Sequence, residues 1–467
     1  RFAALGQDCA LLYVEGLSDG EQMAQHILRP MMNSPLFLSG RSAAEQAMQN
    51  VLTVPEAESG PEIAQALDDL LRGLCLLLID GCDQALRIDL RSYSRRALST
   101  PQNETVVVGP NDAFNETLRD NLTILHRRLP SPDFVCSIRK VGTETPGQVA
   151  LCYLDGVCPA ETVEELQRRL DGVGLDYVLS AGTLEQLIED DPYAPLPQVV
   201  GTERPDRAVS FLMEGQAVLL LDGSPRALAL PVSLWHLFHA PDDSYMRWQY
   251  GTFMRLLRLL GALVTLLLPA VFVSLVVYHP ITIPMTLLTS IMQSRTNVPI
   301  NLFEETLLMV AVFALINESA IRIPGMMGSS LGLVSTLILG TAAVDAGLVS
   351  PLLIIVVALS GLGSYAMPNY PLSFAFRLGQ VALLLAAGIT GVSGLCYAVV
   401  MLLCWVAAME SLGQPFLAPG SPRRTHNPDL LLRAPTFRQR LRAYLSDPRE
   451  MKRAYGRMRR FDGRDQE

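Results

Sequence analysis

The sequence of 467 residues lacks the short motifs by which most cofactor-dependent enzymes are recognised. It contains neither the G-x-x-x-x-G-K pattern of a phosphate-binding loop nor the glycine fingerprint of a dinucleotide site. Its eight cysteines include no C-x-x-C pair. We therefore interpret them as reduced thiols, as is usual for a protein domain in the cytosol, and expect no cofactor and no metal site.

Two patterns that resemble catalytic or metal-binding motifs lack their partners. Residues 328–332, GSSLG, match the G-x-S-x-G nucleophile pattern, but the one histidine that follows them is His426, in a basic tail. We interpret the match as chance. His236 and His239, in LWHLFH, could bind a metal, but this spacing before an apolar segment favours a packed helix. The sequence therefore offers no credible catalytic set, and we expect a protein that is not an enzyme.

Long apolar runs are abundant in the second half of the chain. Since a helix needs about 20 apolar residues to cross a bilayer, the sequence predicts six membrane spans, at 259–279, 302–320, 327–349, 351–367, 375–392 and 393–412. The tail after Ser421 holds 13 arginines and lysines and should stay in the cytoplasm, like the arginines before the first span. Both ends inside require an even number of crossings, so 302–320 must cross despite its charges.

This charged span carries four polar residues, Glu304, Glu305, Asn317 and Glu318. Two interpretations stay open. Glu318 and Arg322, four residues apart, could form an ion pair at one membrane interface while the other two carboxylates lie at the opposite one. Alternatively the helix lines a water-filled ion path, since Glu304, Ala311 and Glu318 recur every seven residues and carboxylates attract cations.

Small residues recur every four positions in the next span, at Gly328, Gly332, Thr336 and Gly340. Such a stripe allows two helices to approach closely. The contact could lie within one subunit, or between subunits around a pore, where it could take part in gating.

The first half of the chain contains two copies of one pattern. ALLYVEGLSDGEQMAQHIL at Ala10 matches ALCYLDGVCPAETVEELQRRL at Ala150, and GLCLLLIDGCDQALRIDL at Gly73 matches GQAVLLLDGSPRALALPV at Gly215. The offsets, 140 and 142 residues, are nearly equal, which indicates a duplication. Each copy predicts a strand, two helices and a strand that turns back at Asp-Gly. We interpret Asp222-Gly223 as such a turn rather than as a catalytic site.

The predicted fold class is α/β plus α-helical membrane protein: two duplicated cytosolic α/β subdomains followed by a multi-span helical transmembrane domain. Between the subdomains we expect an amphipathic helix whose apolar face carries Phe114, Leu118, Leu122 and Leu125. The expected boundaries are 1–100 and 141–250 for the subdomains, 101–140 for the connecting segment, 251–413 for the membrane domain and 414–467 for the basic tail.

Several blocks together give the chain a resemblance to a known family. GTERPDRAVSFLMEGQAVLLLDGSPRALALP, NESAIRIP, GTAAVDAGLVSP, YAMPNYPLSFAFRL and SLGQPFLAP resemble the A subunits of GerA-type spore germinant receptors. The similarity runs from about Ala10 to Pro435, and its most specific block is Thr202, Glu203, Arg204, Pro205 and Asp206. The SpoVAF-type paralogue shares the soluble blocks.

The resemblance implies a membrane protein of the spore inner membrane. Its expected partners are further copies of itself, with five as the expected number, a transporter-like B subunit, a lipoprotein C subunit and membrane lipid, but no nucleic acid. The implied activity is a nutrient-gated ion channel that releases monovalent cations and starts germination. A scaffold that does not conduct and a transporter-like subunit are the alternatives, although we see no inverted repeat of a transporter.

The chain departs from the family pattern in three places. Val108 precedes Gly109-Pro110 where arginine is usual, His126 replaces a common arginine, and Asn317-Glu318-Ser319 stands where Arg-Glu-Ala is typical. The glutamate is kept while its neighbours change, which favours a role for Glu318.

Overall fold

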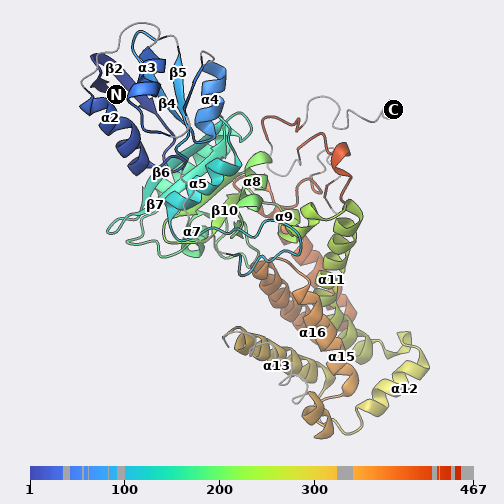
Figure 1. The fold of residues 1–467 in the computed structure, drawn as a ribbon. Coiled ribbons are helices and arrows are strands. Elements are labelled where there is room, and N and C mark those ends of the chain that lie inside the picture. Colours follow the sequence, from blue (N-terminus) through green and yellow to red (C-terminus); the bar gives the residue numbers. More distant parts are fainter. Residues whose placement is uncertain are drawn as a thin grey trace, which may run out of the picture. The chain divides into compact units, whose positions relative to one another are not determined.

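A computed structural model describes residues 1–34, 43–54, 57–60, 63–82, 84–91, 100–322, 340–422, 429–430, 432–442 and 448–453. The chain divides into two compact units (Figure 1). The α/β unit holds Arg1–Glu189, Gly201–Pro231 and Ser446–Met451, and the helical unit holds Asp190–Val200, Val232–Leu445 and Lys452–Glu467.

The α/β unit contains two five-stranded sheets with the same strand order. The first sheet has the order β1-β2-β4-β5-β3, and its strands are Phe2–Ala4, Gln7–Leu12, Ala57–Gly60, Cys75–Ile79 and Ala85–Ile88 for β1 to β5. The second has the order β6-β7-β9-β10-β8, and its strands are Phe134–Val141, Gly147–Leu154, Val200–Thr202, Ala217–Leu221 and Ala227–Leu230 for β6 to β10. Adding five to each strand number converts one order into the other, as a duplicated chain predicts.

The two predicted Asp-Gly turns lie between antiparallel neighbours. Gly81 separates β4 from β5 and Gly223 separates β9 from β10, and both glycines have positive φ angles, +76° and +83°. Asp222 also accepts a hydrogen bond at 3.0 Å from the backbone N–H of Leu118, at the start of helix α5. The carboxylate therefore stabilises a helix N-terminus, where backbone N–H groups lack partners within the helix.

Helices cover the central strands of the second sheet. Helices α5 (Leu118–Arg128) and α8 (Pro205–Met213) contact one another and both contact β7 and β9, while α6 (Ala160–Asp171) contacts β6 and α7 (Ala181–Ile188) contacts β10. All residues of β9 and β10 are buried. A strand covered on both faces is continuously apolar instead of alternating, as the sequences AVLLL and ALAL are.

The other helices of the α/β unit lie in the first of the two duplicated copies. They are α1 (Gly20–Met23), a π-helical turn at Ala24–Leu28, α2 (Arg29–Asn33), α3 (Ala43–Asn50) and α4 (Ile63–Leu71). The expected helix of the connecting segment is α5, but it begins at Leu118. Phe114 was wrongly placed in this helix, which begins four residues later. The backbone N–H of Phe114 instead donates to the carbonyl of Glu203.

The helical unit is built around α11 (Trp248–Tyr278), which packs against α15 (Pro351–Tyr365) and α16 (Tyr370–Ala408). Its other elements are α9 (Leu234–Phe238), α10 (Asp242–Tyr245), α12 (Met285–Ser294), α13 (Leu302–Arg322), short 3-10 turns at Pro280–Thr282 and Thr436–Arg438, and the strand pair β11 (Glu410–Ser411) and β12 (Gln414–Pro415). Gly261 of α11 lies against Gly363 of α15, so small residues let these two helices approach closely.

The run α16 is two helices that fold back on one another at Gly391. Gly391 has φ +67° and ψ −144°, a conformation outside the helical region that favours glycine. Beyond this turn, Leu402 lies beside Gly379, and Leu395 shares an apolar cluster with Leu383. The turn falls one residue before the end of the predicted span 375–392.

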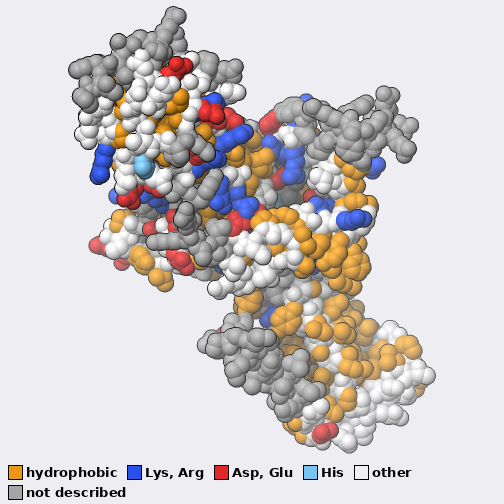
Figure 2. Space-filling view, in the orientation of Figure 1, with side chains coloured by type: hydrophobic (Ala, Val, Ile, Leu, Met, Phe, Trp, Pro, Cys, Tyr) orange, Lys and Arg blue, Asp and Glu red, His pale blue; other side chains and the backbone are white. Residues whose placement is uncertain are grey.

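Within the described residues, α11 with 31 residues and α16 with 39 residues are long and apolar enough to cross a membrane, and α15 is a shorter apolar helix. On the face that Figure 2 shows, hydrophobic side chains gather over the helical unit. Most of the expected span 327–349 lies outside the described residues, since the structure describes none of 323–339. The helix α12 was not predicted.

Candidate functional site

The first candidate site is the polar helix α13, and its Glu305 is held inside the unit. The Glu305 side chain is fully buried. Its Oε2 accepts from Nε of Arg295 at 3.2 Å, and its Oε1 accepts from the backbone N–H of Ser350 at 2.6 Å, at the start of α15. One carboxylate thus compensates a guanidinium and satisfies a helix N-terminus, which fixes α13 to the end of α12 and to α15.

The opposite face of α13 is exposed along its length. Glu304, Leu308, Ala311, Leu315 and Glu318 all lie on the surface, with exposed fractions of 47% for Leu308 and 68% for Leu315. Their spacing of four and three residues places them on one stripe of the helix. We call this set the α13 stripe. It combines two carboxylates, 14 residues apart, with apolar side chains between them.

A chain of polar side chains joins the end of α13 to α15 and α16. The Asn317 Oδ1 accepts a hydrogen bond from the hydroxyl of Tyr365, and the ring of Tyr365 lies 5.4 Å from the guanidinium carbon of Arg377. Arg377 in turn donates to the hydroxyl oxygen of Ser364 from Nε at 3.1 Å and from Nη2 at 2.9 Å. Asn317, Ser364, Arg377 and the buried Gln380 line a cavity of about 80 Å³, which has room for a few water molecules.

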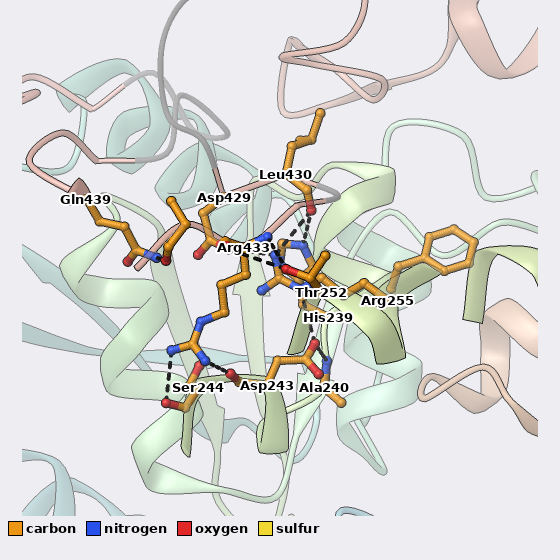
Figure 3. Close-up of polar contacts among 12 residues, drawn as sticks. His239, Ala240, Asp243, Ser244, Thr252, Arg255, Asp429, Leu430, Arg433 and Gln439 are labelled. Atoms are coloured by element: carbon orange, nitrogen blue, oxygen red, sulfur yellow. Dashed lines mark hydrogen bonds and ion pairs between the residues drawn. The ribbon is translucent and has the colours of Figure 1, made fainter. Parts of the chain in front are cut away.

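The second candidate site is a cluster of charges at the start of α11 (Figure 3). Asp243 of α10 is buried, and its Oδ2 accepts from the backbone N–H of Ala240 at 3.2 Å, from Nε of Arg255 at 3.2 Å and from Nη1 of Arg258 at 2.7 Å. Arg255 also donates to Oδ1 of Asp429 at 2.6 Å. The cluster therefore connects α10, α11 and the segment after α16 through charge-assisted bonds.

Arg433 holds the tail against the same place. Its guanidinium donates to the backbone carbonyls of Asp243, Ser244 (3.0 Å) and Met246 (2.9 Å), at the C-terminal end of α10. The backbone N–H of Arg433 donates to the hydroxyl of Thr252 at 3.0 Å (Figure 3). Carbonyls at a helix C-terminus carry partial negative charge, so a guanidinium is well placed there.

The two histidines that resembled a metal motif have structural partners. His236 lies in α9 and forms a reciprocal capping arrangement with Ser233, with its Nδ1 3.1 Å from the Ser233 backbone nitrogen. His239 Nε2 lies 2.8 Å from the carbonyl oxygen of Leu430. In the part of the chain that the structure describes, no three His, Cys, Asp or Glu side chains are grouped to hold a metal ion.

The block from Thr202 to Asp206 is a clamp for the connecting segment, and Arg204 is its centre. The Arg204 side chain is wholly buried. It donates to both carboxylate oxygens of Asp206 at 3.1 and 2.9 Å, to the carbonyl of Glu104 at 3.2 Å and to that of Pro110 at 2.8 Å. Pro205 follows as the first residue of α8, where its missing N–H costs nothing.

The neighbours of Arg204 hold the same segment. The carboxylate of Glu203 accepts from the backbone N–H groups of Gln102 at 3.0 Å and Asn103 at 3.3 Å. The hydroxyl of Thr202, which is buried, bonds to the carboxylate of Glu104. The block is therefore built to fix a loop onto the second sheet, and sequence reasoning named it without finding this role.

The remaining predicted positions lie outside or at the edge of the described residues. Gly328, Gly332 and Thr336 fall in 323–339 and are not described. At Gly340 nothing lies within 4 Å of the position that a Cβ would occupy. Sequence reasoning missed Arg295, Arg377 and Asp243. The signal that could have found them is an arginine or aspartate close to an apolar run, since such a charge needs a partner.

Comparison with known proteins identifies the family to which the chain belongs. The family model described as Bacillus/Clostridium GerA spore germination protein matches residues 1–444. Spore germination protein GerLA of Bacillus cereus is 33% identical over 414 residues, which is 89% of this chain and 84% of that protein. Spore germination protein B1 of Bacillus subtilis is 33% identical over 446 residues, 95% of this chain and 92% of that protein. The crystal structure of the N-terminal domain of the A subunit of the Bacillus megaterium spore germinant receptor GerK3 is 28% identical, with a TM-score of 0.38, and covers 48% of this chain and 82% of that chain.

Proposed function

Because the chain belongs to the Bacillus/Clostridium GerA family of spore germination proteins, we propose that it is the A subunit of a spore germinant receptor. Copies of it assemble in the spore inner membrane into a nutrient-gated channel for monovalent cations. A transporter-like B subunit and a lipoprotein C subunit complete the receptor. In this role the protein catalyses no reaction of a substrate, and its output is the ion flux that starts germination.

The observation that carries the proposal is the α13 stripe. Glu304 and Glu318 are 14 residues apart, which is roughly 21 Å along a helix. In a bilayer core about 30 Å thick, Leu308 and Leu315 lie in the middle and the two carboxylates toward the edges, where a charge that faces lipid is still unfavourable. In a ring of copies around a common axis, the leucines pack against neighbouring copies and the carboxylates face a water-filled path.

A ring of carboxylates also supplies the selectivity. Each copy contributes one Glu318, and several like charges around a narrow path focus the field and concentrate cations. Glu305 does not take part directly in this account, since Arg295 compensates its charge. Glu304 and Glu318 are the two carboxylates of α13 on its exposed face, and the polar chain from Asn317 to Arg377 positions the end of the helix near Glu318.

The proposed topology has six crossings with both ends in the cytosol. They are α11, α13, the segment 327–349, α15 and the two halves of α16. Arg247 and Trp248 stand at the cytosolic start of α11, the kinds of residue that anchor a helix at a membrane interface. Nutrient binding opens the channel only to the extent that the nutrient-bound receptor favours the open arrangement.

The packing of α13 stripes between copies is tested by cross-linking. In a chain with Cys396 and Cys404 replaced by serine, Ala311→Cys places one thiol in the middle of the stripe. Oxidation of the purified receptor should link copies of the chain into dimers, because only two thiols join in each bond. Met309→Cys is the matched control, since Met309 is buried within the unit and should not link. A protein that stays monomeric with Ala311→Cys would refute the proposed assembly.

A further inference from the structure

Two cysteines of the second sheet lie directly opposite one another. In the antiparallel pair of β6 and β7, Cys136 is the partner of Cys152, and the two sulfur atoms are 3.1 Å apart. Both are free thiols. Opposed residues in antiparallel strands have Cα atoms about 4.5 to 5.5 Å apart, which lies inside the range of about 4.4 to 6.8 Å that a disulfide spans. An S–S bond can therefore form here with little movement of the backbone.

The surroundings make the two thiols unequal. The hydrogen bond between the two thiols and the neighbouring imidazole of His126 lower the pKa of Cys136, against the opposing effect of burial. The same interaction with Cys136, together with full burial, raises the pKa of Cys152. His126 lies at the end of α5, where its ring and the ring of Phe134 are arranged edge to face with their centroids 4.8 Å apart. Cys136 is thus the nucleophile of the pair and Cys152 the proton donor.

We propose that Cys136 and Cys152 form a redox-active dithiol that hydrogen peroxide oxidises to a cross-strand disulfide. The Cys136 thiolate attacks a peroxide oxygen, the O–O bond breaks, and the leaving hydroxide takes a proton to become water. The sulfenic acid formed on Cys136 is then attacked by the Cys152 sulfur. The S–O bond breaks, the S–S bond forms, and the Cys152 proton leaves with the oxygen as a second water. Two thiols lose two electrons to the peroxide, which is reduced to two waters.

Three other cysteines of the α/β unit, Cys9, Cys75 and Cys158, are poor competitors for the oxidant. Burial raises the pKa of Cys9 and of Cys75, and raises that of Cys158 to about 12. Protonated thiols react slowly with peroxides, because the thiolate is the nucleophile. Cys158 is a useful internal reference, since it lies near Cys152 in the sequence and is equally buried in the same unit.

The test uses the full-length protein in detergent and one molar equivalent of hydrogen peroxide. Free thiols are then blocked, the protein is cut with trypsin, and the peptides are identified by mass spectrometry. Cleavage after Arg139 and Lys140 places Cys136 and Cys152 in different peptides, so a disulfide joins them; Cys152 and Cys158 share the peptide 141–168, and fragment ions assign which of the two is linked. We expect this linked pair to form at least tenfold faster than Cys158 is lost, and Cys152→Ser to stop at a sulfenic acid that dimedone traps on Cys136.

His126 acts as a positioning residue, and its role is read from the pH profile. His126→Phe should move the midpoint of the rate of Cys136 oxidation to higher pH, while Arg127→Met, the exposed neighbour, should leave it unchanged. Circular dichroism verifies that the serine and phenylalanine variants are folded. The proposal is overturned if Cys136 reacts no faster than Cys158, or if Cys136 becomes oxidised without forming a bond to Cys152.

Discussion

Neutralising Asp243 should release the tail from the start of α11. In the wild-type protein one buried carboxylate accepts from Arg255 and Arg258, with side-chain exposures of 4% and 13%. The cluster of Asp243, Asp429, Arg255, Arg258 and Arg433 has three positive and two negative charges, and Asp243→Asn leaves three against one. Removing one partner of a buried pair costs about 3 to 5 kcal/mol, because the remaining charge stays buried without compensation.

This cost translates into the population of an open tail. Since every 1.4 kcal/mol is a factor of ten, a loss of about 3 to 5 kcal/mol raises that population by roughly 140-fold to 3,700-fold. Trypsin can cut after Arg433 only when the guanidinium leaves the carbonyls of Asp243, Ser244 and Met246. When opening and closing are fast, the cutting rate follows the open population. We expect cleavage between Arg433 and Ala434 to accelerate by at least 100-fold in Asp243→Asn.

Two variants make this prediction specific. Glu410→Gln removes one negative charge from an exposed site of the same unit and should change the cutting rate by less than threefold. Adding Arg258→Met to Asp243→Asn removes one of the excess positive charges and should lower the cutting rate of the single variant at least tenfold, since residues in one ion-pair network do not act additively. A rate within threefold of wild type in Asp243→Asn would refute the idea that this carboxylate holds the cluster together.

Three further predictions concern other contacts. Arg204→Met removes a wholly buried guanidinium that bonds to Asp206, and a loss of about 3 kcal/mol should accelerate amide hydrogen exchange in residues 102–110 by roughly 100-fold. Burial, followed by Glu189, raises the pKa of Glu185 from 4.5 to about 7, so its protonated form stabilises the folded state below pH 4.5 and this stability is lost as pH rises to 7. Glu185→Gln should therefore raise stability at pH 8 by about 1 to 3 kcal/mol and flatten its pH dependence in urea unfolding. Gly391→Ala forces a side chain into a φ of +67° and should lower the yield of monodisperse protein severalfold on size exclusion.

Each of these has a matched control and a result that contradicts it. Arg127→Met, an exposed arginine, should leave exchange in 102–110 unchanged, and equal exchange in the Arg204 variant would contradict the clamp. Glu161→Gln, an exposed glutamate of α6, should not alter the pH dependence, whereas an unchanged slope in Glu185→Gln would show that Glu185 is not the titrating group. Gly340→Ala has open space for its Cβ and should express normally, and a normal yield for Gly391→Ala would contradict the tight turn.

The features that could be predicted from the sequence depend on neighbouring residues. The Asp-Gly turns at Gly81 and Gly223 follow from local turn chemistry, and the repeat in the sequence predicts two sheets of equal order. Apolar length predicts α11 and the two halves of α16. By contrast α12 has ten residues, with polar threonine and serine among its apolar ones, and lacks membrane length. It could not be found by those criteria.

The partners of the site residues could not be predicted because they are distant in the sequence. Arg204 bonds to the carbonyls of Glu104 and Pro110, about a hundred residues earlier, and only the fold brings them together. Glu305 was interpreted with the other carboxylates of its helix as lying at an interface or lining a path. The structure gives it Arg295 at the end of α12 and the backbone of Ser350 at the start of α15, and Ser350 is 45 residues away in the sequence. That carboxylates near Glu318 line an ion path stays a prediction.

The measurement that tests the central claim most directly is cation flux through the reconstituted receptor. The chain and its receptor partners are placed in liposomes, oligomer integrity is verified, and nutrient-triggered flux of monovalent cations is compared for wild type, Glu318→Gln, Glu318→Lys and the control Glu161→Gln. The account predicts flux in the wild type and the control, a severalfold decrease with Glu318→Gln, and a shift toward anions with Glu318→Lys. Equal cation flux in all four proteins would contradict the place of Glu318 in the path, and the absence of flux from an intact wild-type receptor would contradict the channel itself.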